Sequence, residues 1–473
     1  MMQCLRMRSA IVRRLAFALS LLWVGGCLSL PSVPSPAETP REAPQVQGAR
    51  GPLSRQESAA ILQKLKAKSG ADGILERHVA LEEAVAGNPL VGGNKVALLQ
   101  DGPATYQAMF KAMRAARDHI NLETYIFEDD EIGRRFAEML IEQQARGVQV
   151  NVIYDSFGSI KTPRAFFDHL REAGIRVLEF GPVNPLEIRK EYALTHRDHQ
   201  KLMVVDGRVA FIGGINISAV YSSSSFGRRS ASGPSREPKG AKDLPWRDTE
   251  VRIEGPVVRD FQKLFLDTWN RQNPKQPLPQ RNYFPELKSA GPDLVRAIGS
   301  DADEAYSPMY VTLVSAINNA ETNIGITAAY FLPDPQLMDA LTAAARRGVP
   351  VTLVLPSQSD FGLVFNAGRS RYEALLEAGV KIYERREALL HAKTMFVDGV
   401  WSTIGSTNID PLSFLHNDEA NAVVLGFDFA GQMQAMFERD IAQSKRVTLQ
   451  EWRHRPIRDR VMEWAGRLWE YWM

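Results

Sequence analysis

The sequence predicts an α/β protein made of two related domains, each with a mixed β-sheet flanked by helices. The domains are expected to meet across a pseudo-twofold axis and to share one site at their interface. Three observations predict this fold class. The chain has 473 residues, which is long for a single hydrophobic core. A pattern that begins at His199 returns at His391, and neighbouring segments repeat with it. In each half a helical pattern ends at a glycine and an apolar, β-branched run follows, as in α/β layers.

Residues 1–26 have the features of an export signal. A basic stretch with four arginines precedes the apolar run Leu15–Val24, which is too short to span a bilayer comfortably. The run leads into Val24-Gly25-Gly26-Cys27, which resembles the cleavage box of bacterial lipoproteins. This resemblance implies a lipidated Cys27 at the start of an exported, membrane-anchored protein, on the periplasmic face of the outer or the inner membrane. An uncleaved anchor and plain secretion are the alternatives.

The segments after the signal are expected to lead into the folded body. Residues 27–52 contain six prolines together with Ser, Glu and Ala, which predicts an extended tether. Residues 53–91 are expected to form a helical N-terminal extension, with a helix around 54–68. The body then divides within the proline-rich stretch 274–285, which gives a first domain over 92–280 and a second over 281–450.

The two halves predict matching helices and strands. Ala145-Arg146-Gly147-Val148 corresponds to Arg346-Arg347-Gly348-Val349, and a buried strand is expected after each glycine, over Val148–Tyr154 and Val349–Leu355. Apolar residues at helical spacing predict the helices 105–117, 132–146, 309–320 and 335–347.

Composition limits the partners. The apolar fraction of 44% and the charged fraction of 24% are ordinary for a soluble globular domain. The net charge is only +2, so binding to nucleic acid is not expected. The chain has two cysteines, Cys4 and Cys27, and these cannot form a disulfide framework or a cysteine-based zinc site.

The repeated pattern carries the candidate chemistry. His199-Gln200-Lys201 is followed by Asp206, and His391-Ala392-Lys393 is followed by Asp398 at the same spacing, 192 positions later. On a strand, residues i and i+2 point to the same face, so each His and Lys are expected to lie together. The aspartates begin Asp-Gly turns, so their first role is expected to be structural.

Two imidazoles and two ammonium groups at one site suit phosphodiester chemistry without a metal. One neutral imidazole can attack phosphorus, while the second protonates the leaving alkoxide and later deprotonates the incoming alcohol or water. The lysines, with Asn216, Ser406 and Asn408, can bind the phosphate oxygens. Each His also needs a group that holds its far nitrogen. Asp248 and Glu419, each seven residues before a glycine, are the candidates for that role, and the alternative is that they form surface salt bridges.

These motifs resemble the phospholipase D superfamily, whose signature is His-x-Lys followed by Asp, then Gly-Gly or Gly-Ser and Asn. The segments Trp246-Arg247-Asp248-Thr249, Tyr330-Phe331-Leu332-Pro333-Asp334 and Asn417-Asp418-Glu419 are similar to the bacterial cardiolipin synthase branch, and the resemblance covers about residues 92 to 455. It implies a phosphohistidine intermediate and neither metal nor cofactor. The implied catalytic residues are His199, Lys201, Asp206, His391, Lys393 and Asp398, and the implied supporting or phosphate-binding residues are Asn216, Asp248, Ser406, Asn408 and Glu419.

Gly214 stands where the second copy has Ser406. The lipoprotein-like start also departs from the family, whose members usually begin with transmembrane helices.

Two segments leave alternatives open. The first half carries the extra stretch Ser222–Asp243, which is either a solvated loop or a basic lid. Residues 451–473 hold four of the eight tryptophans and several arginines, and Ile457, Val461 and Trp464 share one helical face with Leu468 and Trp472. Such a helix either lies at a bilayer interface or packs its tryptophans against the body.

The function predicted from these residues is phosphatidyl transfer on a phospholipid, with phosphatidylglycerol as donor and an alcohol headgroup as acceptor. The resemblance favours His199 as nucleophile and His391 as general acid and base, but the pseudo-symmetry allows the reverse. Hydrolysis to phosphatidic acid is the main alternative. A nuclease of the same superfamily and a non-catalytic lipid-binding lipoprotein are less favoured, because the charge is nearly neutral and both motifs are intact.

Overall fold

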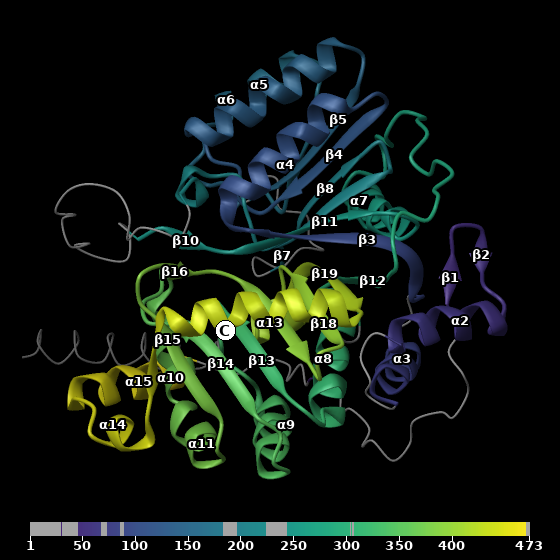
Figure 1. Ribbon diagram of the computed structural model, residues 1–473. Helices are drawn as coiled ribbons and strands as arrows, with labels where there is room; N and C mark the ends of the chain where they lie inside the picture. The colour runs from purple at the N-terminus through teal and green to yellow at the C-terminus, as the bar shows by residue number, and fades with distance from the viewer. Residues whose placement is uncertain are drawn as a thin grey trace, which may run out of the picture. The chain divides into compact units, whose positions relative to one another are not determined.

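The structure is a computed structural model that describes residues 30, 46–67, 73–85, 89–182, 196–223, 244–302, 304 and 307–469. All the elements described below belong to one compact unit, Ser32–Met473 (Figure 1). The predicted signal, the lipidation site Cys27 and most of the extra stretch after Ser222 lie outside the described residues.

The end of the predicted tether is more structured than its composition suggests, and the extension after it is helical as expected. Residues 46–52, expected to be part of an extended tether, instead form the hairpin β1 (Gln47–Gly48) and β2 (Gly51–Pro52). Pro52 is tolerated because it occupies a short strand at the end of the hairpin. The helices α2 (Arg55–Lys66) and α3 (Ile74–Val85) follow, and α2 begins with a capping box between Ser54 and Glu57.

The first lobe runs from β3 to α7. Its strands are β3 (Val91–Gln100), β4 (His119–Thr124), β5 (Gln149–Asp155), β6 (Arg176–Phe180), β7 (Arg197–Asp198), β8 (Lys201–Val205), β9 (Val209–Gly213), β10 (Trp246–Arg247) and β11 (Thr249–Glu254). Its helices are α4 (Asp101–Ala115), α5 (Glu131–Ala145), α6 (Arg164–Glu172) and α7 (Val258–Gln272), with a 3₁₀ turn at Ala219–Tyr221.

The second lobe repeats this order. Its strands are β12 (Asp293–Ser300), β13 (Ile324–Ala328), β14 (Val351–Pro356), β15 (Lys381–Arg385), β16 (Leu389–Leu390), β17 (Lys393–Val397), β18 (Trp401–Gly405), β19 (Asn417–Leu425) and β20 (Ser444–Val447). Its helices are α8 (Pro308–Asn319), α9 (Pro335–Arg346), α10 (Gly362–Arg369), α11 (Tyr372–Glu377), α12 (Pro411–Leu415), α13 (Phe427–Ala442), α14 (Leu449–Arg453) and α15 (Ile457–Trp469).

The two lobes have the same sheet order, which confirms the predicted mixed α/β fold with two related halves. In the first lobe the strands pair in the order β6-β5-β4-β8-β9-β11-β3, and in the second β15-β14-β13-β17-β18-β19-β12. Strand β3 joins them, because its first residues pair with β12 and its later residues with β11. In each of these orders the first three strands are parallel and the others antiparallel, and in the second lobe β20 adds an antiparallel strand beside β15.

Left-handed glycines end the helices where the sequence predicts. Gly147 and Gly348 have φ of 90° and 93°, which residues other than glycine rarely adopt, and each lies just before a buried strand. The predicted helices and strands therefore appear within a few residues of their expected bounds.

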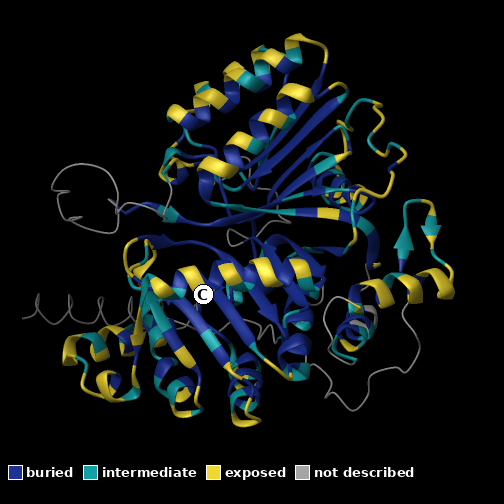
Figure 2. Cartoon of the chain, viewed as in Figure 1, coloured by how far each residue is buried: buried dark blue, intermediate teal, exposed yellow. Residues whose placement is uncertain are grey.

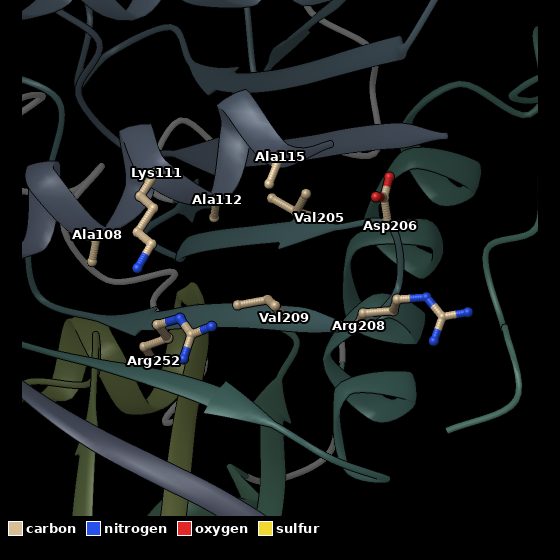
Figure 3. Close-up of a pocket in the computed structure, with 9 residues that line it drawn as sticks. All are labelled: Ala108, Lys111, Ala112, Ala115, Val205, Asp206, Arg208, Val209 and Arg252. Carbon is tan, nitrogen blue, oxygen red and sulfur yellow. The ribbon is translucent and has the colours of Figure 1, made fainter. Parts of the chain in front are cut away.

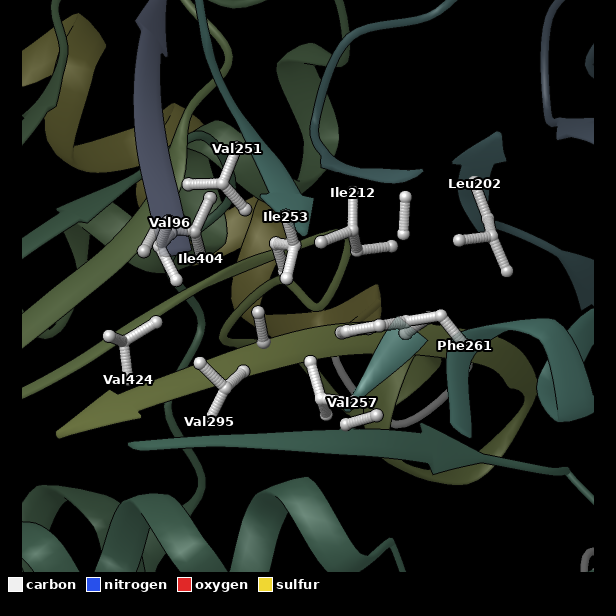
Figure 4. Packing of buried hydrophobic residues seen from close by; sticks show 14 of the residues in the cluster. Val96, Leu202, Ile212, Val251, Ile253, Val257, Phe261, Val295, Ile404 and Val424 are labelled. Atoms are coloured by element: carbon white, nitrogen blue, oxygen red, sulfur yellow. The ribbon is translucent and has the colours of Figure 1, made fainter. Parts of the chain in front are cut away.

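Two large hydrophobic cores form within the described residues, and one of them joins the lobes. One core lies under α4, α5 and α6 in the first lobe and includes Phe136 and Val152. The other contains residues of both lobes, including Ile212 and Val251 from the first and Ile404 and Val424 from the second (Figure 4). Figure 2 shows the strands as mostly buried, with the exposed residues concentrated on the helices and loops. Because burying one large aliphatic side chain contributes about 1.5–3 kcal/mol, the shared core ties the stability of one lobe to the other.

Short strands cross between the lobes next to both predicted histidines. Strand β7 pairs in parallel with the start of β19, and β10 pairs in parallel with β16. His199 and His391 were expected on strands, but each lies just before one, since β8 and β17 begin at Lys201 and Lys393. The physical reason is a change of partner: the backbone N–H of His199 donates to Asp418 O at 2.9 Å, and that of His391 donates to Arg247 O at 2.8 Å, in each case across the lobes.

The C-terminal segment forms α14 and α15, which pack on the second lobe. Trp452 is buried against Tyr372, with ring centroids 4.7 Å apart, whereas Trp464 is exposed. Within the described ranges, no helix combines the length and the apolar character that crossing a bilayer requires.

Candidate active site

Each histidine of the repeated motif is held by a carboxylate from the other lobe. The Nδ1 atom of His199 lies 3.0 and 3.1 Å from the two oxygens of Glu419, and the Nδ1 atom of His391 lies 2.7 Å from Asp248 Oδ2. All four side chains are buried. These contacts leave the Nε2 atom of each ring as the reactive nitrogen, because a ring that donates Nδ1–H to a carboxylate has its lone pair on Nε2.

The strands that cross between the lobes explain why each imidazole contacts a carboxylate of the opposite lobe. Glu419 lies on β19, whose first residues pair with β7 just before His199. Asp248 follows β10, whose residues pair with β16 just before His391. Next to Asp248, the buried guanidinium of Arg247 forms an ion pair with Asp440 of α13, at 3.0 and 2.8 Å. The two lobes must therefore be docked before either imidazole has its carboxylate.

The two lysines lie beside their histidines. Lys201 Nζ donates to the backbone oxygen of His199, and Lys393 Nζ donates to that of His391 and lies 3.0 Å from His391 Nδ1. Burial is the main cause of the lowered pKa values of His199 and Lys201, and the charge of Lys393 from the other lobe lowers both further. Because such effects weaken with distance, the lysines and imidazoles of both copies form one electrostatic cluster.

Burial sets the charge states of this cluster. It lowers the pKa of His199 to about 4, against the opposing effect of Glu419, and it lowers the pKa of His391, to which Lys393 adds. Both rings are therefore neutral near pH 7. Burial also lowers the pKa of Lys201 to about 7 and lowers that of Lys393. Although burial opposes ionisation of Glu419, His199 and Lys201 lower its pKa to about 2, so it stays a carboxylate.

Asp206 and Asp398 lie away from the imidazoles. Each stands at the far end of its strand from the lysine, about 16 Å along five extended residues. Asp206 accepts backbone N–H groups of Arg117, Asp118 and His119, and Asp398 accepts those of residues 321–323. Both have positive φ, 53° and 56°. This geometry is that of turn and support residues.

The predicted phosphate-binding residues occupy different surroundings. Ser406 Oγ accepts the Ala420 N–H at 2.9 Å and donates to the Ala420 backbone oxygen at 3.3 Å, and its hydroxyl is among the groups that lower the pKa of Glu419. Gly214, its counterpart, has no room for a side chain, because a Cβ there would lie 2.2 Å from Asp248 Oδ1. Asn216 donates to the Tyr221 hydroxyl at 3.1 Å and accepts the Ile126 N–H, so its polar groups are used within the protein.

Asn408 differs from its counterpart. Its side chain is buried and its Oδ1 has no hydrogen-bond partner among the described residues. The second copy therefore offers a carbonyl oxygen whose counterpart in the first copy, Asn216 Oδ1, already accepts the Ile126 N–H.

Aromatic rings around the imidazoles are site residues that the repeated motif does not reveal. The Tyr125 ring lies edge-on to His199 at 5.1 Å, and its centroid is 5.2 Å from Lys201 Nζ. Trp246 lies 5.0 Å from the His391 ring, and the Tyr221 hydroxyl is 3.2 Å from His391 Nδ1. The position of Trp246 two residues before Asp248 is the one sequence signal that could have indicated this role.

A group of possible metal ligands beside the site is already occupied by an arginine. His196, Asp301 and Asp418 bring ligand atoms within 4.8 Å of one another. Arg271 forms ion pairs with both aspartates, and His196 Nε2 lies 2.7 Å from Asp418. The guanidinium supplies the positive charge that these carboxylates need, so a metal is not required to balance them.

A separate pocket of about 460 Å³ opens on the outer side of the first lobe (Figure 3). It is lined by alanines of α4 and by Val205 and Val209, with Lys111 and Arg252 reaching toward it. Asp206 is the only motif residue among its lining residues, and neither histidine contributes. The pocket is therefore distinct from the paired imidazoles.

Comparison with known proteins identifies the family. Residues 109–225 and 313–441 match the family described as cardiolipin synthase, PLD-like domain. The chain is 32% identical to the cardiolipin synthase of Alkalihalophilus pseudofirmus, over 86% of this chain and 77% of that one. It is 34% identical to cardiolipin synthase A of Pseudomonas aeruginosa, over 76% of this chain and 69% of that one.

A solved structure shows the same fold. The crystal structure of phosphatidylserine synthase from Haemophilus influenzae aligns with a TM-score of 0.60 at 11% identity and covers 83% of this chain and 99% of that chain. With matched segments in both halves and relatives along most of its length, the chain belongs to the cardiolipin synthase family of the phospholipase D superfamily, an enzyme family of phosphatidyltransferases.

Proposed function

We propose that the protein transfers the phosphatidyl group of phosphatidylglycerol to an alcohol headgroup through a phosphohistidine intermediate. With a second phosphatidylglycerol as acceptor, the products are cardiolipin and glycerol. The observation that carries the proposal is the pair of buried imidazoles, each oriented by a carboxylate of the opposite lobe. The cardiolipin synthases among the relatives support the choice of substrate.

The first step uses His199 as nucleophile and His391 as acid. The neutral His199 attacks phosphorus through Nε2, a P–N bond forms, and the bond from phosphorus to the glycerol headgroup oxygen breaks. His391 gives its proton to the leaving oxygen, and so must be protonated when substrate is bound. The anionic phosphodiester favours this, because its charge opposes burial and the Lys393 charge, which together lower the pKa of the ring.

The second step reverses these roles. The now neutral His391 takes a proton from the acceptor hydroxyl, whose oxygen attacks phosphorus while the P–N bond breaks and His199 is regenerated. The ammonium groups of Lys201 and Lys393 bind the phosphate oxygens and stabilise the charge that develops on them. Asp248 and Glu419 position the rings. Asp206 and Asp398 are proposed to act indirectly, by stabilising the turns that follow the motif strands.

Products from phosphatidylglycerol vesicles test the proposal. Purified protein should release one glycerol for each cardiolipin formed, and phosphatidic acid, with the glycerol released alongside it, should be a minor product. Phosphatidic acid alone would show that water is the acceptor and that the enzyme is a hydrolase. No turnover with any phospholipid, together with cleavage of single-stranded DNA, would favour the nuclease alternative. His199→Ala and His391→Ala should each abolish turnover, and a near-normal rate in either would contradict the two-imidazole mechanism.

We also propose that the mature protein is a membrane-anchored lipoprotein that begins at Cys27, with the domain limits 92–280 and 281–450. The lipobox-like segment before Cys27 supports the anchor. Mass spectrometry of the N-terminal peptide should find a lipid on Cys27. In a fractionated host that exports the protein, Cys27→Ser should remove that modification, and an unmodified Cys27 in the membrane-bound wild type would contradict the proposal.

A further inference from the structure

Exposed apolar side chains gather next to the imidazoles. We call Phe157, Ile160, Val220 and Phe361 the apolar rim. Among the large hydrophobic residues that are exposed in the described ranges, every one except Phe284 lies on this rim or on α15. Scattered exposed apolar residues are common on soluble proteins, but their concentration in one region marks an interaction surface.

Contacts tie the first part of the rim to His199. Phe157 is 54% exposed, and it lies in the loop before α6. In the same loop, Ser159 Oγ donates to the backbone oxygen of Tyr125 at 3.2 Å, and the Tyr125 ring contacts His199. The guanidinium of Arg197, two residues before His199, lies 5.7 Å from the Phe157 ring centroid.

The rest of the rim borders His391. Val220 precedes Tyr221, whose hydroxyl is 3.2 Å from His391 Nδ1. Phe361 is 45% exposed and follows Asp360, which accepts the Tyr330 hydroxyl at 2.7 Å, and the Tyr330 ring lies 6.3 Å from the ring of His391. Both imidazoles are thus bordered by segments that carry an outward apolar side chain.

Helix α15 extends the rim. It lies beside α10, which begins directly after Phe361, and Gly466 packs so closely that a Cβ would lie 2.7 Å from Ala367 N (Figure 1). The opposite face of α15 has no partner among the described residues: Ile457 and Val461 are exposed, and Trp464 is 63% exposed (Figure 2). This face is the one that the sequence pattern left undecided between bilayer and body.

The charges beside these apolar residues are mostly positive. Lys161 is exposed in the loop after Phe157, Arg164 is exposed at the start of α6, and Arg458 and Arg467 are exposed on α15. None of the four forms an ion pair with another described residue, whereas the acidic Glu463 of α15 is buried and paired with Arg455. Aromatic and aliphatic side chains next to unpaired basic groups match the apolar depth and the anionic surface of a phospholipid bilayer.

We propose that the apolar rim and the outer face of α15 form one docking surface for an anionic phospholipid bilayer. This inference rests on the proposed function, in which a phospholipid must present its phosphodiester to His199 while its acyl chains stay in the membrane. That requirement is the reason for a docking surface beside the site. Docking places the imidazoles at the headgroup level and supplies substrate laterally. It is a second contact with the membrane, independent of any lipid on Cys27.

Vesicle sedimentation tests the surface without requiring turnover. The full chain with Cys27→Ser, which lacks the proposed lipid, should bind vesicles of phosphatidylglycerol and phosphatidylcholine more tightly than vesicles of phosphatidylcholine alone. Phe157→Ser with Phe361→Ser, and separately Val461→Ser with Trp464→Ser, should each weaken binding by about tenfold or more, because large apolar side chains leave the membrane. Arg458→Gln with Arg467→Gln should weaken binding only to the anionic vesicles, and added salt should reduce that difference.

Phe284→Ser is the matched control, because Phe284 is 51% exposed but lies outside the rim and α15. It should bind like the parent, and circular dichroism should show each variant folded. Binding by the rim and α15 variants that equals the parent's, or equal weakening by Phe284→Ser, would overturn the proposal.

On a dispersed short-chain phosphatidylglycerol the docking variants should turn over like the parent. Vesicle binding without any turnover would leave the docking surface supported and the proposed reaction wrong.

Discussion

At the residue scale, the site depends on hydrogen bonds that orient two neutral imidazoles. Asp248 and Glu419 are fully buried, and each contacts the ring of the opposite motif. A carboxylate in this position favours the tautomer with its proton on Nδ1 and stabilises the imidazolium when it forms. The pKa values of the nearby lysines are lowered for the same reason as those of the rings. Burial disfavours the charged form, and the surrounding carboxylates offset only part of that effect.

Replacing either orienting carboxylate by its amide should lower kcat while leaving the fold intact. For Glu419 the matching amide is Gln, which keeps the length of the side chain, whereas Asn would shorten it. We expect Glu419→Gln and Asp248→Asn each to reduce kcat by roughly 10²–10⁴, since the amide can hold the wrong tautomer. Steady-state kinetics would measure the loss, and a melting temperature near that of the wild type would separate it from unfolding. Retention of full kcat in either variant would remove these residues from the mechanism.

The activity should depend on pH in a bell-shaped manner. As pH rises through about 4, His199 loses its proton and becomes nucleophilic, so kcat/KM increases. As pH rises further, His391 loses the proton that it must give to the leaving oxygen, and through about 7 Lys201 loses the charge that binds phosphate, so kcat/KM decreases. Rate measurements on a dispersed short-chain substrate would show both limbs. Lys201→Arg, which stays charged, should move to higher pH the part of the alkaline limb that Lys201 sets, and an unchanged limb in that variant would assign it to His391 alone.

At the scale of elements, the two Asp-Gly turns fasten the ends of β8 and β17 to the neighbouring strands. Asp398 also accepts a hydrogen bond from His78 of α3 at 3.0 Å, and Asp206 has no such partner among the described residues. Burial opposes ionisation, but the bonds from His78 and from the backbone lower the pKa of Asp398 overall. The N-terminal extension is thus fastened to the second lobe at a motif residue.

Removing these carboxylates should affect stability more than chemistry. Asp398→Ala should reduce the free energy of unfolding by about 3 kcal/mol or more, because it leaves several N–H groups and His78 without their acceptor. Asp206→Ala should cost less, since it lacks the histidine. Urea denaturation would give both values, and kcat per folded molecule should remain within a few-fold of the wild type. A large loss of kcat at unchanged stability would assign the aspartates a direct role in the reaction.

At the scale of the whole molecule, one chain supplies a complete site. His199 and His391 belong to different lobes, and the core that contains Val251 and Ile404 joins those lobes. Mixing the His199→Ala and His391→Ala proteins should therefore not restore turnover, because no single site regains both imidazoles. Product analysis of the mixture measures this directly, with each variant alone as control. Recovered activity would show that the lobes exchange between chains.

The shared core also predicts cooperative unfolding. Strand β3 pairs with strands of both lobes, and Trp401 of the second lobe donates to Glu82 of α3 at 2.7 Å. We expect calorimetry to show a single transition for the folded body, with equal calorimetric and van 't Hoff enthalpies. Two separated transitions would show that the lobes are independently stable.

Much of the fold was predictable because its signals are local. The helical spacing before Gly147 and Gly348 and the β-branched runs after them depend on residues within a few positions, and the structure has both helices and both strands there. The hairpin at 47–52 was not predictable, since proline-rich composition predicts an extended chain and its pairing with β3 is a tertiary contact.

The sequence by itself determined the repeat, the pairing of His with Lys, and the kind of reaction that those groups can perform, because side-chain chemistry and short-range spacing do not depend on the fold. Only the tertiary structure decided which carboxylate serves which imidazole. The partners are 220 and 143 positions apart, and they meet through strands that cross between the lobes. It also decided that the tryptophan at 452 is buried and the one at 464 exposed, because a helical face acquires or lacks a partner only when the body has packed.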